Sequence, residues 1–222
     1  EARAFAQGHG AAFYQAHGHM YDALRHFDGR LTERLMYRSV AGAAILGASW
    51  VVFHPYGEAS MLAQTRQILR DMAQLADEQG IGLAIENLPG GRDTPFADVE
   101  PLAELVDALP CRQKGICWDT SHGHLAHFAK QAERMREAGA RIVALHVSDN
   151  NGRGDDHLAP FTGQIDWLEV MRALRDIGYR GTLNFEAHGF VNHAPPPVRG
   201  ILIRALYDVG RYLVELASPQ LP

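Results

Sequence analysis

Six short apolar runs in this 222-residue chain each lead to a side chain that can bind a metal ion. The runs and the residues that follow them are 11–14 with His17, 51–53 with His54, 81–85 with Glu86, 115–118 with Asp119, 142–145 with His146, and 182–185 with Glu186. Successive members of this set are 27 to 40 positions apart, which is enough for a strand, a loop and a returning helix. The carboxyl ends of parallel strands in a β/α barrel lie on one face. We therefore expect the six side chains to converge, and a metal site is the leading interpretation.

Two segments add further metal-binding side chains. His122 follows Asp119 by three positions, which would place both at the barrel mouth; the alternative is an Asp that caps a helix and a solvent-facing His. Asp155 and His157 are two positions apart, so in an extended segment they point the same way and can bind one ion. The acidic residues beside them, Asp149 and Asp156, are expected in solvated turns.

The two glutamates follow apolar strands directly, where an unpaired carboxylate is costly to keep charged. A buried ion pair with Arg or Lys is the alternative to a metal, but only Arg92 lies near Glu86 in the sequence. His17 is preferred over His19 as a ligand, and His188 is expected to line the pocket without binding a metal. The other five histidines follow no strand and are expected to be solvent-exposed: His9, His26, His124, His127 and His193.

Segments with helical periodicity lie between the apolar runs. They are 1–7, 31–46, 58–79, 98–109 with Asp98 as cap, 122–138, 166–177 with Asp166 and Glu169 at capping-box spacing, and 198–217. The strands are continuously apolar, as in sheets covered by helices. We predict an α/β fold, a TIM (β/α)₈ barrel that lacks its first two strands, as one N-terminally incomplete domain over 1–222. A complete six-stranded barrel and a doubly wound sheet are alternatives, but no strand is followed by a glycine-rich phosphate fingerprint.

Composition narrows the function classes. The formal charge is −5 with 46% hydrophobic residues, so there is no global positive field to attract nucleic acid. The two cysteines, Cys111 and Cys117, lack metal-type spacing and are read as reduced thiols of a cytoplasmic protein. No apolar stretch reaches the length of a membrane span, roughly 20 residues. Because the first residue is Glu1, targeting cannot be judged from this sequence.

From His17 to the final helix the sequence resembles the xylose isomerase-like TIM-barrel superfamily, which includes sugar isomerases and epimerases and also endonuclease IV. The segment 163–167 (Gly-Gln-Ile-Asp-Trp) is similar to one in short members of this group. The resemblance implies two ligand sets. Glu86, Asp119, His146 and Glu186 resemble the single-metal site of ketose epimerases; His17 and His54, with His122, Asp155 and His157, resemble the further ligands of the trinuclear zinc site of endonuclease IV. The chain departs from ketose epimerases at Gly152, where they carry an Arg; Arg153 follows.

These observations favour a metal-dependent isomerase or epimerase acting on a small sugar or sugar phosphate. Glu86 and Glu186 would be the acid/base pair of an enediolate mechanism. Ligands with N and O atoms favour Zn²⁺ or Mn²⁺, with Mg²⁺ and Co²⁺ as alternatives. A zinc phosphodiesterase acting at abasic DNA is the rival, and a binding protein without activity is a third option. We expect no membrane partner, and a homo-oligomer would cover the open sheet edges.

Overall fold

The computed structural model describes residues 1–19, 29–55, 61–90 and 94–217, and its centre is a parallel sheet of five strands. The strands run in sequence order across the sheet: β1 (Gln15–His17), β2 (Trp50–Phe53), β3 (Gly82–Glu86), β4 (Lys114–Asp119) and β5 (Ile142–His146). All neighbouring pairs are parallel. The predicted α/β fold with sequentially added parallel strands is therefore confirmed, in the form of a half-barrel.

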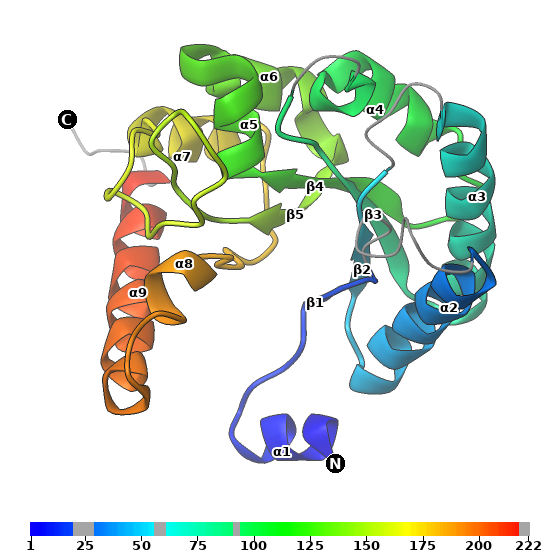
Figure 1. Ribbon diagram of the computed structural model, residues 1–222, viewed down its shortest axis with the longest axis horizontal. Coiled ribbons are helices and arrows are strands. Elements are labelled where there is room, and N and C mark those ends of the chain that lie inside the picture. The colour runs from blue at the N-terminus through cyan, green and yellow to red at the C-terminus, as the bar shows by residue number, and fades with distance from the viewer. Residues whose placement is uncertain (20–28, 56–60, 91–93, 218–222) are drawn as a thin grey trace.

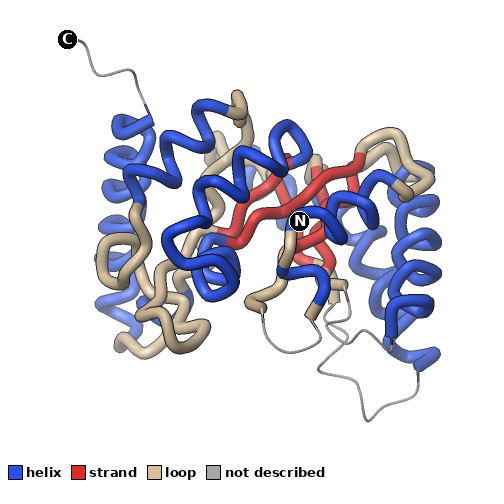
Figure 2. The backbone as a smooth tube through the Cα atoms, turned by 90° about the horizontal axis from the view of Figure 1, so that it is seen from above, coloured by secondary structure: helices blue, strands red, loops and turns tan. Residues whose placement is uncertain are grey.

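Helices cover the outside of the curved sheet. They are α1 (Ala2–Gly8), α2 (Gly29–Leu46), α3 (Leu62–Glu78), α4 (Val99–Asp107), α5 (Thr120–His127), α6 (Gln131–Ala138), α7 (Trp167–Asp176), α8 (His188–Val191) and α9 (Pro196–Ala217), with short 3₁₀ turns at 95–97, 128–130 and 139–141. Most of them form an arc from α9 through α7, α6, α4 and α3 to α2 (Figure 1). The view from above places the strands in the middle, with helices on either side (Figure 2).

The two faces of the sheet carry different side chains because successive residues of a strand alternate between faces. Large residues such as Leu83, Ile85 and Trp118 point outward and join the main core under the helices. The inner face holds a separate layer of smaller buried residues: Val52, Ala84, Cys117 and Ala144. Two positions after each of these four residues stand His54, just past the end of β2, and Glu86, Asp119 and His146, the last residues of β3, β4 and β5. Strand periodicity therefore brings the predicted ligands together above a closely packed floor.

Two of the six predicted strands differ from the structure. The first was expected at 11–14 but pairs with β2 only over Gln15–His17, so His17 lies within the strand end. The last, 182–185, is reduced to a single parallel bridge between Val147 and Phe185. The carbonyl groups of Val143 and Leu145 in β5, which a longer strand would need for pairing, accept hydrogen bonds from Tyr14 Oη (3.1 Å), just before β1, and from Gln15 Nε2 (3.2 Å) of β1.

The predicted helices are present with one interruption. The segment 122–138 forms α5 and α6 rather than one helix, because Phe128 has a φ of 49° that a continuous helix cannot contain. Asp98 occupies the cap position of α4 but makes no side-chain capping bond, whereas Asp166 accepts one from the Glu169 amide of α7 (3.1 Å). Within the described part of the chain, no helix has both the length and the apolar character needed to cross a membrane. Cys111 and Cys117 are both buried and free.

Candidate metal centre

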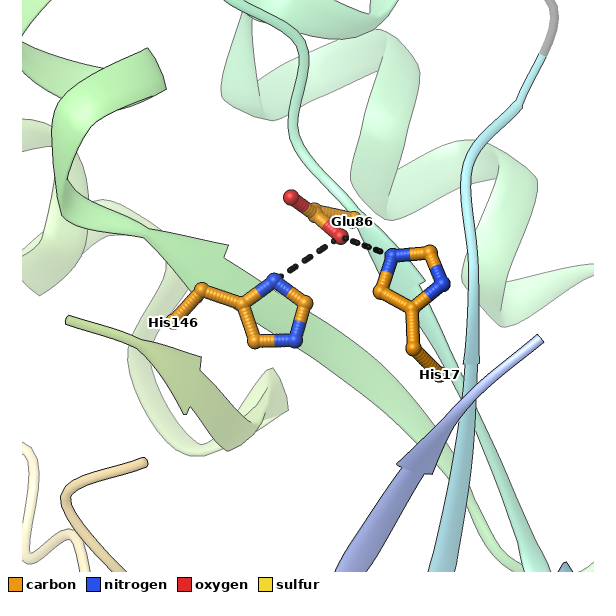
Figure 3. A group of neighbouring side chains, drawn as sticks. All are labelled: His17, Glu86 and His146. Atoms are coloured by element: carbon orange, nitrogen blue, oxygen red, sulfur yellow. Dashed lines mark ion pairs between the residues drawn. The ribbon is translucent and has the colours of Figure 1, made fainter. Parts of the chain in front are cut away.

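Glu86 lies at the centre of the predicted site, at the carboxyl end of β3. Its side chain is 1% exposed, and its Oε2 atom faces three histidine nitrogens: His54 Nε2 at 2.8 Å, His146 Nδ1 at 3.0 Å and His17 Nε2 at 3.4 Å. Figure 3 shows the carboxylate between the His17 and His146 rings. A fourth histidine, His122, places Nδ1 3.4 Å from Oε1. One buried carboxylate thus has four imidazoles around it.

Asp119 ends the next strand and uses its two carboxylate oxygens differently. Oδ1 accepts a 2.7 Å hydrogen bond from the His122 amide, so the aspartate does cap α5. Oδ2 is buried and has no hydrogen-bond partner. His122 itself is 5% exposed, so the alternative of a solvent-facing histidine is wrong. The cap leaves one aspartate oxygen available to a metal ion.

Glu186 directly follows Phe185, which forms the single bridge to Val147, and is the fourth predicted ligand of the central group. Its Oε2 atom lies 2.9 Å from His146 Nδ1, the same nitrogen that faces Glu86. Glu86, Asp119, His146 and Glu186 each offer a donor atom, and these four atoms all lie within 4.8 Å of one another. Three carboxylates and one imidazole therefore surround a common point.

The loop after β5 connects the remaining predicted ligands. Asp155 Oδ2 lies 3.2 Å from His122 Nε2 and 3.0 Å from His157 Nε2. Through these contacts all nine residues named from the sequence form one connected network, and His19 lies outside it with its amide bonded to Ser39. The convergence expected from the strand-end pattern is thus present, while the ligand roles of the individual residues remain predictions.

Three buried polar atoms of the cluster make no hydrogen bond and are suited to binding a metal ion. Glu86 Oε2, Asp119 Oδ2 and His146 Nδ1 have no partner with acceptable hydrogen-bond geometry, although Glu86 and His146 approach to 3.0 Å. No Arg or Lys among the described residues forms an ion pair with Glu86; Arg92, the base near it in the sequence, lies outside them. Buried unpaired polar atoms are costly, and a divalent ion would satisfy all three. The donor set fits the predicted metal.

The charges of the cluster are strongly coupled. Burial alone would raise the pKa of Glu86, but His54, His146 and His122 outweigh it and hold that pKa well below its ordinary value. Burial alone would lower the pKa of His146, but the neighbouring Cys117 and Glu86 raise it well above the ordinary value. Burial raises the pKa of Asp119 to about 6 despite the opposing effect of His122. Without metal, protons on the histidines therefore compensate the buried carboxylates.

Two buried side chains that sequence reasoning missed hold the strand ends in place. Asn87 Oδ1 accepts from the Asp119 amide (2.7 Å), Asn87 Nδ2 donates to Asp119 O (3.1 Å), and the Asn87 carbonyl accepts from His122 Nδ1 (2.8 Å). Thr120 Oγ1 donates to Ser148 O at 2.7 Å, which joins the ends of β4 and β5. The only sequence signal was their position directly after a strand-end ligand. Such outer partners orient ligands.

Asp149 and His124 were expected to face solvent, and both expectations are wrong. Asp149 is fully buried and accepts five hydrogen bonds, from the amides of residues 150, 161, 163 and 165 and from Trp167 Nε1. His124 is 7% exposed and its Nδ1 lies 2.8 Å from Asn150 Oδ1. His127 is partly buried, and its Nε2 donates to Ala97 O (2.9 Å), while His9 and His193 are exposed as expected. His26 lies outside the described residues.

The comparisons with known proteins agree on one family. Residues 1–203 match the family model described as xylose isomerase-like TIM barrel. This chain belongs to that family. An uncharacterized protein of Methanocaldococcus jannaschii is 30% identical over 166 residues, which cover 71% of this chain and 57% of that protein.

Two further relatives have names that state an activity. A D-psicose 3-epimerase of Enterocloster bolteae is 30% identical over 118 residues, which cover 53% of this chain and 37% of the epimerase. A solved D-psicose 3-epimerase, crystallised in the presence of D-fructose, superposes with a TM-score of 0.73 at 17% identity, over 96% of this chain and 82% of that one. The sequence matches span roughly one third to just over half of the curated relatives' own length. The barrel class predicted from the sequence is thereby confirmed.

The metal-free form of this family member should lose stability as the pH rises. The pKa values of His122 and His146 lie well above 6.5 in the folded chain, so their stabilising protons are fully present below pH 6.5 and are lost at higher pH. The lowered pKa of Glu86 also stabilises the folded chain, and this contribution is lost only in acid, when the carboxylate becomes protonated. We expect a lower melting temperature at pH 9 than at pH 6 after chelation. Added Zn²⁺ should weaken or reverse this trend, because metal binds deprotonated imidazole.

Melting curves by circular dichroism, with and without chelator, measure this effect. A metal-free protein that is equally stable or more stable at pH 9 would show that the histidine network is uncharged in the folded state.

Proposed function

We propose that this chain carries the catalytic centre of a metal-dependent isomerase or epimerase for a small sugar or sugar phosphate. The observation that supports it most is the pair of glutamates that share one histidine. Glu86 Oε2 and Glu186 Oε2 lie 3.0 and 2.9 Å from His146 Nδ1. Two carboxylates, one at the end of β3 and one just after the bridge beside β5, belong to a metal-type donor set and are suited to moving a proton to and from carbon.

The two glutamates differ in their surroundings, which suits different tasks. Glu86 is buried with 1% of its side chain exposed, whereas the side chain of Glu186 is 30% exposed. The pKa of Glu186 is lowered because the hydrogen bond and charge of His146 outweigh its burial. Both groups are therefore ionised near neutral pH. In our proposal Glu86 removes a proton from the carbon next to the sugar carbonyl. Glu186, whose side chain is 30% exposed, takes up a proton from solvent water and supplies it to that carbon on the opposite side.

A divalent ion held by Glu86, Asp119, His146 and Glu186 would supply positive charge next to the sugar oxygens where negative charge develops. The four side chains provide one nitrogen and three carboxylates, with no thiolate. This donor set suits Mn²⁺, Co²⁺ or Mg²⁺ as well as Zn²⁺. The neighbouring histidines at the rim of the set increase its preference for Zn²⁺ or Mn²⁺. The names of two relatives, both D-psicose 3-epimerases, add support for a ketose as substrate.

A zinc phosphodiesterase acting at abasic DNA remains the second candidate because five further ligand-type residues join the same network. These are His17, His54, His122, Asp155 and His157. Electrostatics oppose this candidate. The chain has a formal charge of −5, and a nuclease needs positive charge to neutralise phosphates beyond the metal. Arg153, the basic residue of the loop after β5, is exposed and its amide bonds to Asn151.

Hydrogen exchange into sugars tests the proposal directly. Metal-loaded protein is incubated in deuterated water with a panel of ketoses and ketose phosphates, and separately with a duplex that contains an abasic site. We expect deuterium at the carbon next to the carbonyl of at least one sugar, seen by NMR or mass spectrometry, and no strand incision. Glu104→Gln, which alters an exposed carboxylate on α4, is the matched control and should retain full exchange.

Strand incision without deuterium in any sugar would replace this proposal with the nuclease. Tight binding of a sugar without exchange would favour the binding-protein alternative.

A further inference from the structure

His188 lies two positions after Glu186 and begins α8, outside the nine residues singled out from the sequence. Its side chain meets His157 and Glu186. Each of the three residues offers one nitrogen or oxygen, and these donor atoms all lie within 4.8 Å of one another. The ring centroids of His157 and His188 are 3.9 Å apart. Two imidazoles and a carboxylate therefore converge beside the four-ligand group, and Glu186 belongs to both.

His157 is oriented as a metal-binding histidine would be. Its Nδ1 donates a 3.0 Å hydrogen bond to the Glu186 carbonyl, which leaves Nε2, now 3.0 Å from Asp155 Oδ2, as the ring atom that could bind a metal ion. Metal-bound histidines commonly fix their second nitrogen in this way. The backbone of His157 also has a φ of 49°, in the left-handed region that residues other than Gly adopt infrequently. The surrounding structure must hold this strained conformation.

Helix α8 packs against the backbone of His157 and supports its conformation. Gly189 packs its Cα against the loop, and a Cβ there would collide with the Asp156 carbonyl and lie 3.0 Å from the His157 carbonyl. The base of the loop is closed by two 2.9 Å hydrogen bonds between Asp149 and Leu158. Glu186 is fixed in turn by a 3.0 Å bond from its amide to the Val147 carbonyl. Backbone contacts thus position His157 and Glu186, and Gly189, next to His188, packs against the same loop.

We propose that His157, Glu186 and His188 form a second metal position, with Glu186 shared between the two ions. Two histidines and one glutamate are a zinc ligand set that keeps a fourth position open for water or substrate. His188 is exposed, so this position would lie at the open side of the site. The grouping differs from the one that the resemblance implied for His157. A donor atom of His157 lies within 4.8 Å of donor atoms of both Glu186 and His188. His157, His122 and Asp155 do not form a group that meets the same distance limit.

Metal stoichiometry tests the second position independently of any reaction. The metal-free 222-residue chain is dialysed against a series of free Zn²⁺ concentrations, and bound zinc is measured by elemental mass spectrometry. We expect His188→Ala to bind one Zn²⁺ fewer per chain than the wild type, or to bind that ion at least about tenfold more weakly. His193→Ala, which removes an exposed histidine just after α8, is the matched control and should bind as the wild type. Asp119→Asn should keep the His188-dependent ion.

Equal zinc binding by the wild type and His188→Ala over the whole series would overturn the second position. The same result would leave the sugar exchange described above unaffected, because that depends on the four-ligand group. Because His188 is exposed, its truncation should not unfold the chain, and His188→Gln with the same melting temperature as the wild type provides a second measurement. Wild-type zinc content in His188→Gln would also contradict the proposal.

Discussion

Replacing Glu86 by Gln should abolish both metal binding at the four-ligand group and deuterium exchange into sugar. The substitution keeps the shape of the side chain but removes the charge that faces the nitrogens of His17, His54 and His146. Loss of an acid/base group alone lowers the rate by about 10²- to 10⁴-fold. Loss of a metal ligand adds to this effect, so exchange should fall below detection. The measurements are zinc content after dialysis and the rate of deuterium incorporation.

Glu104→Gln is the control for Glu86→Gln, since it removes one carboxylate on the outside of the barrel. It should retain wild-type zinc content and exchange. If Glu86→Gln bound metal as the wild type does and exchanged deuterium at the same rate, Glu86 would be a structural residue only.

The second large effect is on folding rather than chemistry. Asp149→Ala should reduce the free energy of unfolding by about 3 to 5 kcal/mol, because buried donors left without an acceptor cost about 1 to 3 kcal/mol each. Asp149 accepts five hydrogen bonds, and those from Ile165 N (3.1 Å) and Trp167 Nε1 (2.9 Å) come from buried residues. They hold the loop after β5 against the start of α7. Urea denaturation followed by tryptophan fluorescence measures the loss.

Asp156→Ala is the matched control in the same loop. Asp156 is partly exposed and accepts one hydrogen bond, from the Asn151 amide at 3.1 Å, so its removal should cost about 1 kcal/mol or less. Similar destabilisation by the two variants would show that the five bonds to Asp149 do not carry the fold of the loop.

The positions of the central predicted ligands could be anticipated because they depend on strand periodicity. Glu86, Asp119 and His146 each end an apolar run, and parallel strands added in sequence order place their ends side by side. Residues two positions earlier on the same face form the inner floor, so the alternation that buries Ala84 also points Glu86 inward. Local pattern and global fold agree at these positions. The sequence alone was therefore sufficient to predict that these three side chains lie close together.

Other features depend on contacts that the local pattern does not contain. Asp149 was expected to be solvated because its donors lie up to 18 positions further along the chain. The first strand was placed too early because Ala11 and Ala12 are apolar yet exposed, while pairing with β2 begins at Gln15. The reduction of the last strand to a single bridge could not be foreseen, because the side chains of Tyr14 and Gln15, from the start of the chain, bond to the carbonyl groups that it would need. His188 was set aside because its partner His157 comes from a distant loop.

The metal ion itself can be located by anomalous X-ray scattering from crystals of this chain grown with Mn²⁺. We expect an anomalous peak surrounded by Glu86, Asp119, His146 and Glu186, with a donor atom of each residue about 2.0 to 2.4 Å from it. Their donor atoms already lie within 4.8 Å of one another, so only small side-chain movements are needed. A fully ordered site without a peak among these four residues, or with Glu86 and Glu186 turned away from each other, would contradict the metal centre on which the proposed function depends.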